Sequence, residues 1–314
     1  MKKNIGLFGF DQKKFLLIKK KFKSCNFYNL SDFNKSYVEF NAFIAYSQDS
    51  FEKFFLKEKF KIYKNLEWVH VSIAGVDEYI KYFNDFKFKF TCGKKIQGTN
   101  VSDHGMALLL SLTRNLNNLS KKIKPNKFRR PIDLYEKKCL IFGLGSIGLG
   151  LASKCNAFGM KVSSIDLKYK SEISFLENQY LFKDLNRVIN EFDIVFIATP
   201  LTSKTEHLFN KNIFKKMKNK SFLINITRGD IIKTPDLIKY IKANKFAGVG
   251  LDVIENEPLK SNNEIFNYDN VIYTHHTAGM SDNFDKRFKL IIDNIENYIL
   301  GEDLINVVDL KNEY

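Results

Sequence analysis

Residues 138–148, KCLIFGLGSIG, decide the fold of this chain. They place Gly143, Gly145 and Gly148 in a G-x-G-x-x-G pattern, directly after an apolar run and at the start of a run with helical periodicity. The first glycine of such a pattern permits a tight turn, the second lets a pyrophosphate approach the backbone, and the third lets the helix pack closely on the strand. The helix N-terminus then faces the phosphates. The stretch therefore predicts a strand, a dinucleotide-binding turn and a helix.

Asp166 ends the next predicted strand, 18 residues after Gly148. A carboxylate at this place accepts hydrogen bonds from the adenosine ribose of a dinucleotide and repels a 2′-phosphate. Lys168 and Lys170 follow closely and offer positive charge to such a phosphate. Because the carboxylate is fixed at a strand end while the lysines are long and hydrated, we expect NAD(H) rather than NADP(H) as the cofactor.

Outside this stretch, predicted strands and helices alternate through nearly the whole chain, which is the pattern of a parallel sheet covered by helices on both faces. We expect strands at residues 3–8, 41–46, 67–72, 138–143, 161–166, 193–198, 221–226 and 247–253. Helical periodicity is clear at residues 101–116, 146–158, 234–244 and 285–300. Residues 120–137 are charged, hold two of the five prolines and predict a surface loop.

The composition excludes several classes of protein. The net charge of +15 suggests nucleic-acid binding, but the basic residues are nearly all lysines scattered along the chain, so we expect no nucleic-acid partner. No apolar run approaches the roughly 20 residues that span a bilayer, so we expect no membrane segment. The four cysteines form no C-x-x-C pair, which argues against a zinc site or a disulfide framework and fits a reducing cytoplasm.

An arginine, a carboxylate and two imidazoles follow the later predicted strands. Arg228 comes just after residues 221–226, Glu257 comes soon after residues 247–253, and His275 and His276 follow the apolar residues of NVIYT. Ligands of open parallel sheets bind at the carboxyl ends of strands. A guanidinium holds a carboxylate or polarises a ketone oxygen. An imidazole transfers a proton, and a neighbouring carboxylate raises the imidazole pKa.

These residues resemble the D-isomer-specific 2-hydroxyacid dehydrogenase family along roughly 240 residues. The matching motifs occur in the family's order: AGVD (74–77), VSDHGMALLL (101–110), GLGSIG (143–148), ATPLTSKT (198–205), NITRGD (225–230), LDVIENEPL (251–259) and HHTAG (275–279). The resemblance implies an α/β fold of two doubly wound, Rossmann- or flavodoxin-like parallel-sheet domains with a cleft between them. It implies a substrate domain at residues 1–99 plus 283–314 and a NAD-binding domain at residues 100–282.

The resemblance also implies catalytic roles. Arg228 resembles the arginine that orients the substrate, and Glu257 resembles the acid paired with the catalytic histidine. The catalytic histidine of the family precedes x-A-G, which selects His276 and leaves His275 where the family usually has a proline. Gly75, with Ala74 before it, lies in the loop whose backbone N–H groups hold the substrate carboxylate.

The cofactor contacts follow by position in the same way, with Asp252 resembling the residue that hydrogen-bonds the nicotinamide amide. The expected cofactor-binding residues are Gly143, Gly145, Ser146, Ile147, Gly148, Asp166, Thr199, Pro200, Thr227 and Asp252, and we expect no metal. Glu255 is expected to be a solvated neighbour of Glu257, and His70, His104 and His207 are expected to be structural.

Together with the motifs above, the resemblance implies a cytoplasmic NAD-dependent D-2-hydroxyacid dehydrogenase that reduces small 2-oxo acids of the glyoxylate or hydroxypyruvate kind. The helix that begins near residue 100 is expected to form a homodimer contact. The alternative is a nucleotide-sensing binding protein that keeps the dehydrogenase fold without significant turnover. Turnover with a 2-oxo acid distinguishes the two functions.

Overall fold

The computed structural model describes residues 2–30, 39–52, 65–83, 87–119, 130–170, 173–280 and 285–312. The chain divides into two compact units, the first made of Met1–Ile96 with Ser281–Tyr314 and the second of Gln97–Met280. The boundaries expected from the sequence lie after residues 99 and 282. Among the described residues, no helix is both long and apolar enough to cross a bilayer.

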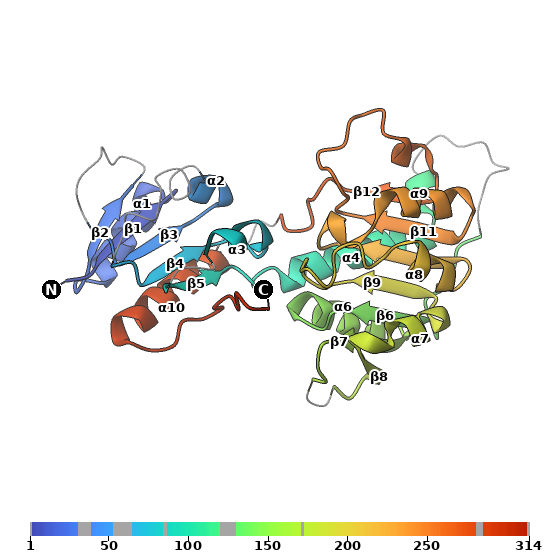
Figure 1. Ribbon diagram of the computed structural model, residues 1–314, viewed down its shortest axis with the longest axis horizontal. Coiled ribbons are helices and arrows are strands. Elements are labelled where there is room, and N and C mark those ends of the chain that lie inside the picture. Colours follow the sequence, from blue (N-terminus) through green and yellow to red (C-terminus); the bar gives the residue numbers. More distant parts are fainter. Residues whose placement is uncertain are drawn as a thin grey trace. The chain divides into compact units, whose positions relative to one another are not determined.

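The first unit is a parallel sheet with the strand order β2-β1-β3-β4-β5 (Figure 1). This is the flavodoxin-like order 2-1-3-4-5. Its strands are β1 (Asn4–Phe8), β2 (Asn26–Asn29), β3 (Ala42–Ala45), β4 (Trp68–Val71) and β5 (Lys89–Cys92). Its helices are α1 (Gln12–Lys21), α2 (Gln48–Ser50), α3 (Asp77–Phe83) and α10 (Asp285–Leu300).

Alternate side chains of these strands fill two separate cores, because successive residues of a strand point to opposite faces of its sheet. On one face, Ile5, Leu7 and Trp68 pack with residues of α1 and α10. On the other face, Val69 and Val71 pack with residues of α3. The first unit is thus covered by helices on both faces, as its continuous apolar strands require.

The second unit is a parallel sheet with the strand order β12-β11-β10-β9-β6-β7-β8 (Figure 1). Its strands are β6 (Lys138–Phe142), β7 (Lys161–Asp166), β8 (Leu176–Leu181), β9 (Ile194–Ile197), β10 (Ser221–Asn225), β11 (Phe246–Leu251) and β12 (Val271–Tyr273). Its helices are α4 (Gly98–Thr113), α5 (Leu116–Leu119), α6 (Ser146–Ala157), α7 (Leu185–Val188), α8 (Lys211–Lys216) and α9 (Thr234–Lys242). Short 3-10 turns are η4 (Phe182–Asp184), η5 (Ile189–Glu191), η6 (Gly229–Ile231) and η7 (Glu264–Asn267).

This strand order creates a switch point between β6 and β9. The chain moves from β6 outward to β7 and β8, then returns to the other side of β6 and moves outward again from β9 to β12. Doubly wound sheets bind ligands at such a point, at the carboxyl ends of the strands. The residues that follow β6, β7, β9, β10, β11 and β12 therefore share one edge of the sheet.

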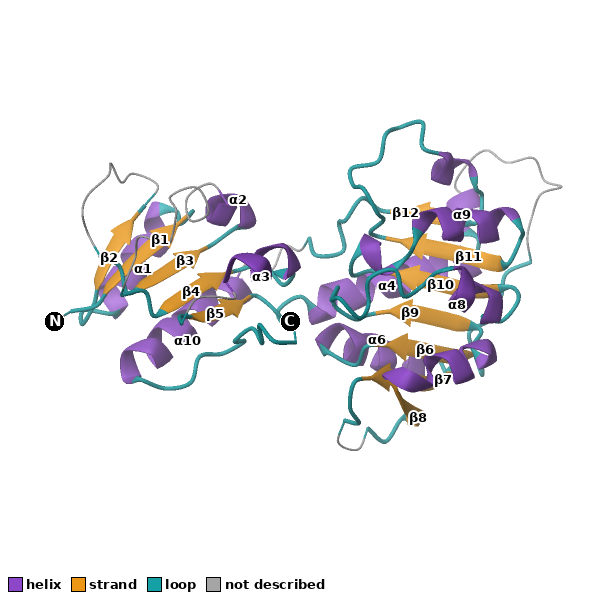
Figure 2. Ribbon diagram, viewed as in Figure 1, coloured by secondary structure: helices purple, strands orange, loops and turns teal. Residues whose placement is uncertain are grey.

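Helices lie on both faces of this sheet (Figure 2). Two hydrophobic cores hold them there. Leu140, Phe142 and Val195 point to the face covered by α7, α8 and α9. Cys139, Ile141 and other alternate residues point to the face covered by α4 and α6. This burial on both faces fixes the register of the strands. The register in turn sets the position at which each strand ends along the common edge.

The two-domain α/β fold predicted from the sequence is confirmed. Each of the eight predicted strands and four predicted helices corresponds to an element of the structure, although residues 101–116 form α4 and α5 rather than one helix. Strands β2, β5 and β8 were not predicted, and β12 was recognised only as the apolar run before His275. Much of the predicted surface loop, residues 120–129, lies outside the described residues.

Candidate active site

The sequence-predicted site residues of the second unit all lie at the carboxyl edge of its sheet. They are Gly143–Gly148 after β6, Asp166 at the end of β7, Thr199 and Pro200 after β9, Thr227 and Arg228 after β10, Asp252 and Glu257 after β11, and His276 after β12. Ala74 and Gly75 belong to the first unit, where they follow β4 and precede α3.

Two of the three glycines of the G-x-G-x-x-G turn are required by close backbone packing. Gly143 has φ +100°, and a Cβ atom there would lie 2.7 Å from the carbonyl oxygen of Ala198. A Cβ atom on Gly148 would lie 1.9 Å from the carbonyl oxygen of Gly143. Any side chain at either position would displace the turn or the start of α6.

Gly145 differs because nothing lies within 4 Å of the place where its Cβ atom would stand. It is the N-cap of α6, and no side chain caps that end of the helix. The first N–H groups of a helix have no partner within the helix, and they carry the positive end of its dipole. The space over Gly145, together with these donors, therefore fits the pyrophosphate of a dinucleotide.

Asp166 holds the same turn from the end of β7. One carboxylate oxygen accepts the N–H of Leu144 at 2.8 Å, and the other accepts the N–H of Leu167 at 2.6 Å. The ammonium group of Lys170 lies 3.8 Å from the carboxylate, whereas Lys168 is exposed. The charge of Asp166 is thus fixed beside the glycine turn, with one lysine close enough to offset part of it.

Asp252 anchors the loop that carries His276. Its side chain is 1% exposed, and its carboxylate accepts hydrogen bonds from the Thr274 hydroxyl at 2.7 Å and from the backbone N–H groups of Thr277 at 2.9 Å and Ala278 at 3.0 Å. His104 of α4, as predicted from the sequence, has a structural contact, with Nε2 2.8 Å from the Thr274 hydroxyl. A buried carboxylate needs this many donors to offset its lost hydration.

His276 and Glu257 are brought together from different strands. Nδ1 of His276 lies 2.9 Å from Oε2 of Glu257, while Oε1 of Glu257 accepts the N–H of Ile254 at 2.7 Å. The hydrogen bond to Glu257 raises the pKa of His276, against opposing effects of burial and of the charge of Arg228. The backbone N–H of His276 donates to the carbonyl oxygen of Asp252 at 2.6 Å. The imidazole is therefore oriented at Nδ1, which leaves Nε2 for a reacting group.

Arg228 stands in the tight turn between β10 and η6. Asn225 is fully buried, and its amide nitrogen donates to the carbonyl oxygen of Arg228 at 2.8 Å. The guanidinium donates to the carbonyl oxygen of Thr227 at 2.8 Å. The charge of this guanidinium lowers the pKa of His276, opposing the effect of Glu257.

Glu255 corrects an expectation of the sequence analysis. It was expected to be a solvated neighbour of Glu257, but its side chain is only 13% exposed and its carboxylate lies 2.6 Å from Nε2 of His207. His207 is structural, as expected, and belongs to the loop after β9. The sequence offered no signal for this contact, because the two residues are 48 positions apart in loops that only the fold brings together.

His70 in the first unit is also structural. It is fully buried on β4, and its ring nitrogens lie 2.8 Å from the Thr91 hydroxyl and 3.2 Å from the Ser72 hydroxyl. Burial lowers its pKa to about 3, so the ring is neutral. A neutral ring held by two hydroxyl groups has no free position for proton transfer to a substrate.

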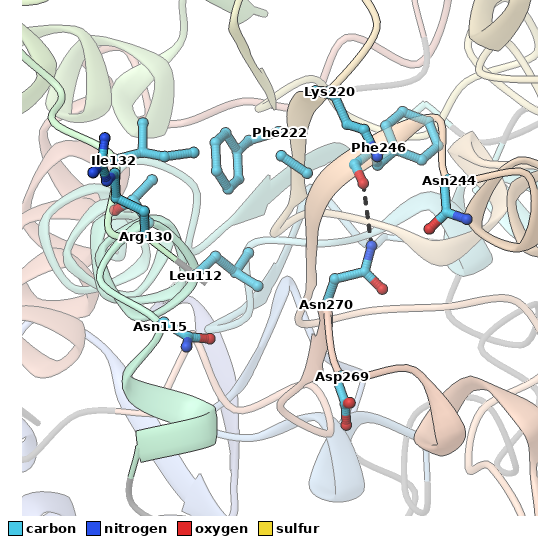
Figure 3. Close-up of a pocket in the computed structure, with 12 residues that line it drawn as sticks. Leu112, Asn115, Arg130, Ile132, Lys220, Phe222, Asn244, Phe246, Asp269 and Asn270 are labelled. Atoms are coloured by element: carbon cyan, nitrogen blue, oxygen red, sulfur yellow. Dashed lines mark hydrogen bonds between the residues drawn. The ribbon is translucent and has the colours of Figure 1, made fainter. Parts of the chain in front are cut away.

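A separate pocket of about 330 Å³ lies at the amino ends of β10 and β11, the opposite edge of the sheet (Figure 3). Phe222 and Phe246 line it, and Asn270 reaches the carbonyl oxygen of Phe246 at 3.2 Å. Arg130 also lines this pocket rather than the edge that holds Arg228. It contains none of the predicted site residues, so the chemistry points to the other edge.

The chain is similar to known proteins in sequence and in fold. Residues 106–278 match the family model described as "D-isomer specific 2-hydroxyacid dehydrogenase, NAD binding domain". The chain is 35% identical over 192 residues to the glyoxylate reductase of Pyrococcus horikoshii, covering 58% of this chain and 57% of that protein. It is 33% identical over 208 residues to glyoxylate/hydroxypyruvate reductase B of Enterobacter agglomerans, covering 63% of each. Both matches span less than two thirds of the relative's length.

The fold recurs in a solved structure of similar size. A D-isomer specific 2-hydroxyacid dehydrogenase family protein from Aeromonas salmonicida superposes with a TM-score of 0.81 at 25% identity, over 99% of this chain and 100% of that one. The family model covers more than half of the chain and includes the glycine turn, Arg228, Glu257 and His276. The chain belongs to the D-isomer specific 2-hydroxyacid dehydrogenase family.

Proposed function

We propose that this protein is an NAD(H)-dependent reductase that converts a small 2-oxo acid into the D-2-hydroxy acid. The observation that carries the proposal is the 2.9 Å contact between His276 and Glu257. This contact lies at the same sheet edge as Arg228 and the open glycine turn. A dinucleotide-binding turn alone would fit many functions, but an oriented imidazole at the same sheet edge as a guanidinium fits reduction of a keto acid.

His276 is the proposed acid/base. With Nδ1 held by Glu257, Nε2 donates a proton to the substrate oxygen during reduction and accepts one during oxidation. Glu257 stabilises the protonated ring, which raises the pKa of His276 and favours the form that can donate a proton. The nicotinamide, when bound, supplies or accepts the hydride.

Arg228 is the proposed substrate-orienting residue. A guanidinium can bind a carboxylate through two parallel hydrogen bonds and can also polarise an adjacent carbonyl oxygen. The backbone N–H groups around Ala74 and Gly75, in the first unit, are proposed to bind a substrate carboxylate. The names of the relatives support glyoxylate or hydroxypyruvate as the small substrate.

We propose NAD(H) as the preferred cofactor. The fixed carboxylate of Asp166 supports this choice because it would repel a 2′-phosphate. The remaining proposed contacts are Gly143, Gly145 and Gly148, the helix-start residues Ser146 and Ile147, the loop residues Thr199, Pro200 and Thr227, and Asp252. We further propose that the protein acts in the cytoplasm as a homodimer through α4.

The test is a panel of 2-oxo acids assayed with NADH and with NADPH. Oxidation of NADH with glyoxylate or hydroxypyruvate, and a product of D configuration wherever the product is chiral, is the expected result. Tight NADH binding without turnover on any 2-oxo acid would favour the nucleotide-sensing alternative. Absence of both binding and turnover would overturn the proposal.

A further inference from the structure

Glu255 connects parts of the chain that follow different strands. One carboxylate oxygen lies 2.6 Å from Nε2 of His207, in the loop after β9. The other accepts the backbone N–H of Thr234, which begins α9 after β10. Glu255 itself follows β11. A single, largely buried carboxylate in the loop after β11 thus contacts the segments that follow the two adjacent strands β10 and β9.

The loops after β9 and β10 are also joined by their backbones. The N–H of His207 donates to the carbonyl oxygen of Asp230 at 2.7 Å, and the N–H of Phe209 donates to the carbonyl oxygen of Ile231 at 3.0 Å. His207 has φ +48°, a conformation that costs free energy in a residue with a side chain. These bonds and the contact with Glu255 hold the residue in that conformation.

Gly229 brings the loop of Arg228 against the loop of Glu257. A Cβ atom on Gly229 would lie 2.1 Å from the carbonyl carbon of Ile254, so the two backbones are in direct contact. Ile254 also donates its N–H to Oε1 of Glu257 at 2.7 Å. A shift of the backbone at residues 254 and 255 would therefore reach Arg228 through Gly229 and would reach His276 through Glu257.

We propose that Glu255, with His207, is a positioning residue that holds the loops after β9, β10 and β11 together and so fixes Arg228 relative to the Glu257–His276 pair. The kinetic part of this inference rests on the proposed function. The structural part, the connection among the three loops, does not. Neither residue needs to contact the substrate or the cofactor.

The kinetic experiment compares Glu255→Ala and Glu255→Gln with the wild type. Misplacement of catalytic groups by about 1 Å can cost about 100-fold in rate. We therefore expect Glu255→Ala to lower kcat/KM for the 2-oxo acid by about 10- to 100-fold, with the Kd for NADH changed less than about threefold. Glu255→Gln keeps an oxygen for the N–H of Thr234, so it should recover a large part of kcat/KM.

Asp193→Asn is the matched control. Asp193 also accepts one backbone N–H, from Lys138 at 3.0 Å, and one side-chain donor, from Lys218 at 2.6 Å, but it precedes β9 at the opposite edge of the sheet. It should leave kcat/KM nearly unchanged. If Glu255→Ala stays within twofold of the wild type, or Asp193→Asn lowers kcat/KM equally, Glu255 is not a positioning residue.

Amide hydrogen exchange tests the connection without any substrate. In Glu255→Ala and His207→Ala, exchange should accelerate by about tenfold or more at residues 228–234 and 254–258, while β9, β10 and β11 keep their protection. Exchange unchanged in those loops would overturn the connection even if the enzyme is active. If the wild type is inactive on every 2-oxo acid, the proposed function is overturned. The hydrogen-exchange result would then decide on its own whether Glu255 and His207 connect the three loops.

The same cluster has a competing explanation as a cation site. His207, Asp230 and Glu255 place possible ligand atoms within 4.8 Å of one another. Against this, each oxygen of Glu255 already has a hydrogen-bond donor, and Asp230 is exposed. Melting temperatures with and without Zn²⁺ distinguish the two explanations. If Zn²⁺ raises the melting temperature of the wild type but not of His207→Ala, a purely hydrogen-bonded connection is contradicted. If both proteins respond equally, the hydrogen-bonded connection is supported.

Discussion

His275 and His276 are adjacent in the chain, but their rings contact different groups. The ring of His275 lies 4.5 Å from that of Tyr273 and stacks on Phe266 at 6.1 Å between ring centroids. The ring of His276 instead contacts Glu257 through Nδ1. Among the described residues, His276 has a hydrogen bond to a carboxylate and His275 has none, which distinguishes the proposed acid/base from its neighbour.

The first prediction concerns these two histidines. Because a positioned acid/base contributes about 10²–10⁴-fold to a rate, His276→Ala should lower kcat by about that factor. Its Kd for NADH should change little. His275→Ala removes aromatic packing only and should lower kcat by less than about fivefold, a smaller effect than the loss of a proton donor. Steady-state kinetics on both variants provide the measurement, and a larger loss in His275→Ala would contradict the assignment of His276.

The second prediction concerns pH. The contact with Glu257 raises the pKa of His276, and reduction needs the protonated ring, so reduction should slow as pH rises through that pKa. Glu257→Gln removes the charge that favours the protonated ring, so the basic limb of the kcat/KM profile should move to lower pH. Glu264→Gln, which alters an exposed pair with Lys242, is the control and should leave the limb in place. If the basic limb of the Glu257→Gln profile stays at the pH of the wild-type limb, Glu257 does not raise the pKa of His276.

The third prediction compares two glycines of the same turn. Gly145→Ala places a methyl group in open space, so the protein should fold normally while NADH binds at least about tenfold more weakly, because the methyl group occupies the approach of the pyrophosphate. Gly148→Ala places a methyl group 1.9 Å from a backbone oxygen and should lower the melting temperature. Calorimetry and NADH titration distinguish the two effects. Unchanged NADH binding in Gly145→Ala would place the dinucleotide elsewhere.

The fourth prediction concerns cofactor choice. Asp166→Asn removes the charge but keeps an oxygen for the N–H of Leu144, so the glycine turn should stay intact. The ratio of kcat/KM for NADPH to that for NADH should rise by about tenfold, which corresponds to about 1.4 kcal/mol. Adding Lys170→Ala should reverse part of that rise, because Lys170 is the lysine nearest the carboxylate. If kcat/KM of the wild type is equal for NADPH and NADH, or higher for NADPH, the proposed role of Asp166 is contradicted.

The fifth prediction concerns stability. Asp252→Asn replaces one acceptor oxygen with an NH₂ group that faces backbone N–H donors in a buried site. Each buried group left without a partner costs about 1–3 kcal/mol, so the free energy of unfolding should fall by about 2 kcal/mol or more. Asp133→Asn, at a side chain 89% exposed, should change it by less than about 0.5 kcal/mol. Urea unfolding measures both, and equal effects would show that the Asp252 hydrogen bonds add no stability.

The sequence predicted the elements whose apolar runs are long and continuous. Central strands such as β6 and β9 are buried on both faces, so their residues are nearly all apolar and easy to identify. Strand β8, LENQYL, is an edge strand with exposed polar residues, and β12 has only three residues. Such strands are defined by the neighbour with which they pair, which local sequence does not specify.

The candidate site was predicted to the extent that its residues follow strands. Parallel strands end at a common edge, so Arg228, Glu257 and His276 could be placed together without knowledge of side-chain positions. Glu255 could not, since its role depends on contacts with His207 and Thr234 that are distant in the sequence. Because acidic residues are mostly exposed, the charge of Glu255 predicted a surface position.

The left-handed backbone at residue 275 has a consequence for consensus design. Replacing a residue by the one most common in its family usually stabilises a protein, and the family usually has proline at this position. Here His275 has φ +52°, whereas a proline ring fixes φ near −65°. His276 follows with φ +57°, so a proline would redirect the chain immediately before the proposed acid/base. At this one position, the family's usual residue is incompatible with the loop that this chain has adopted.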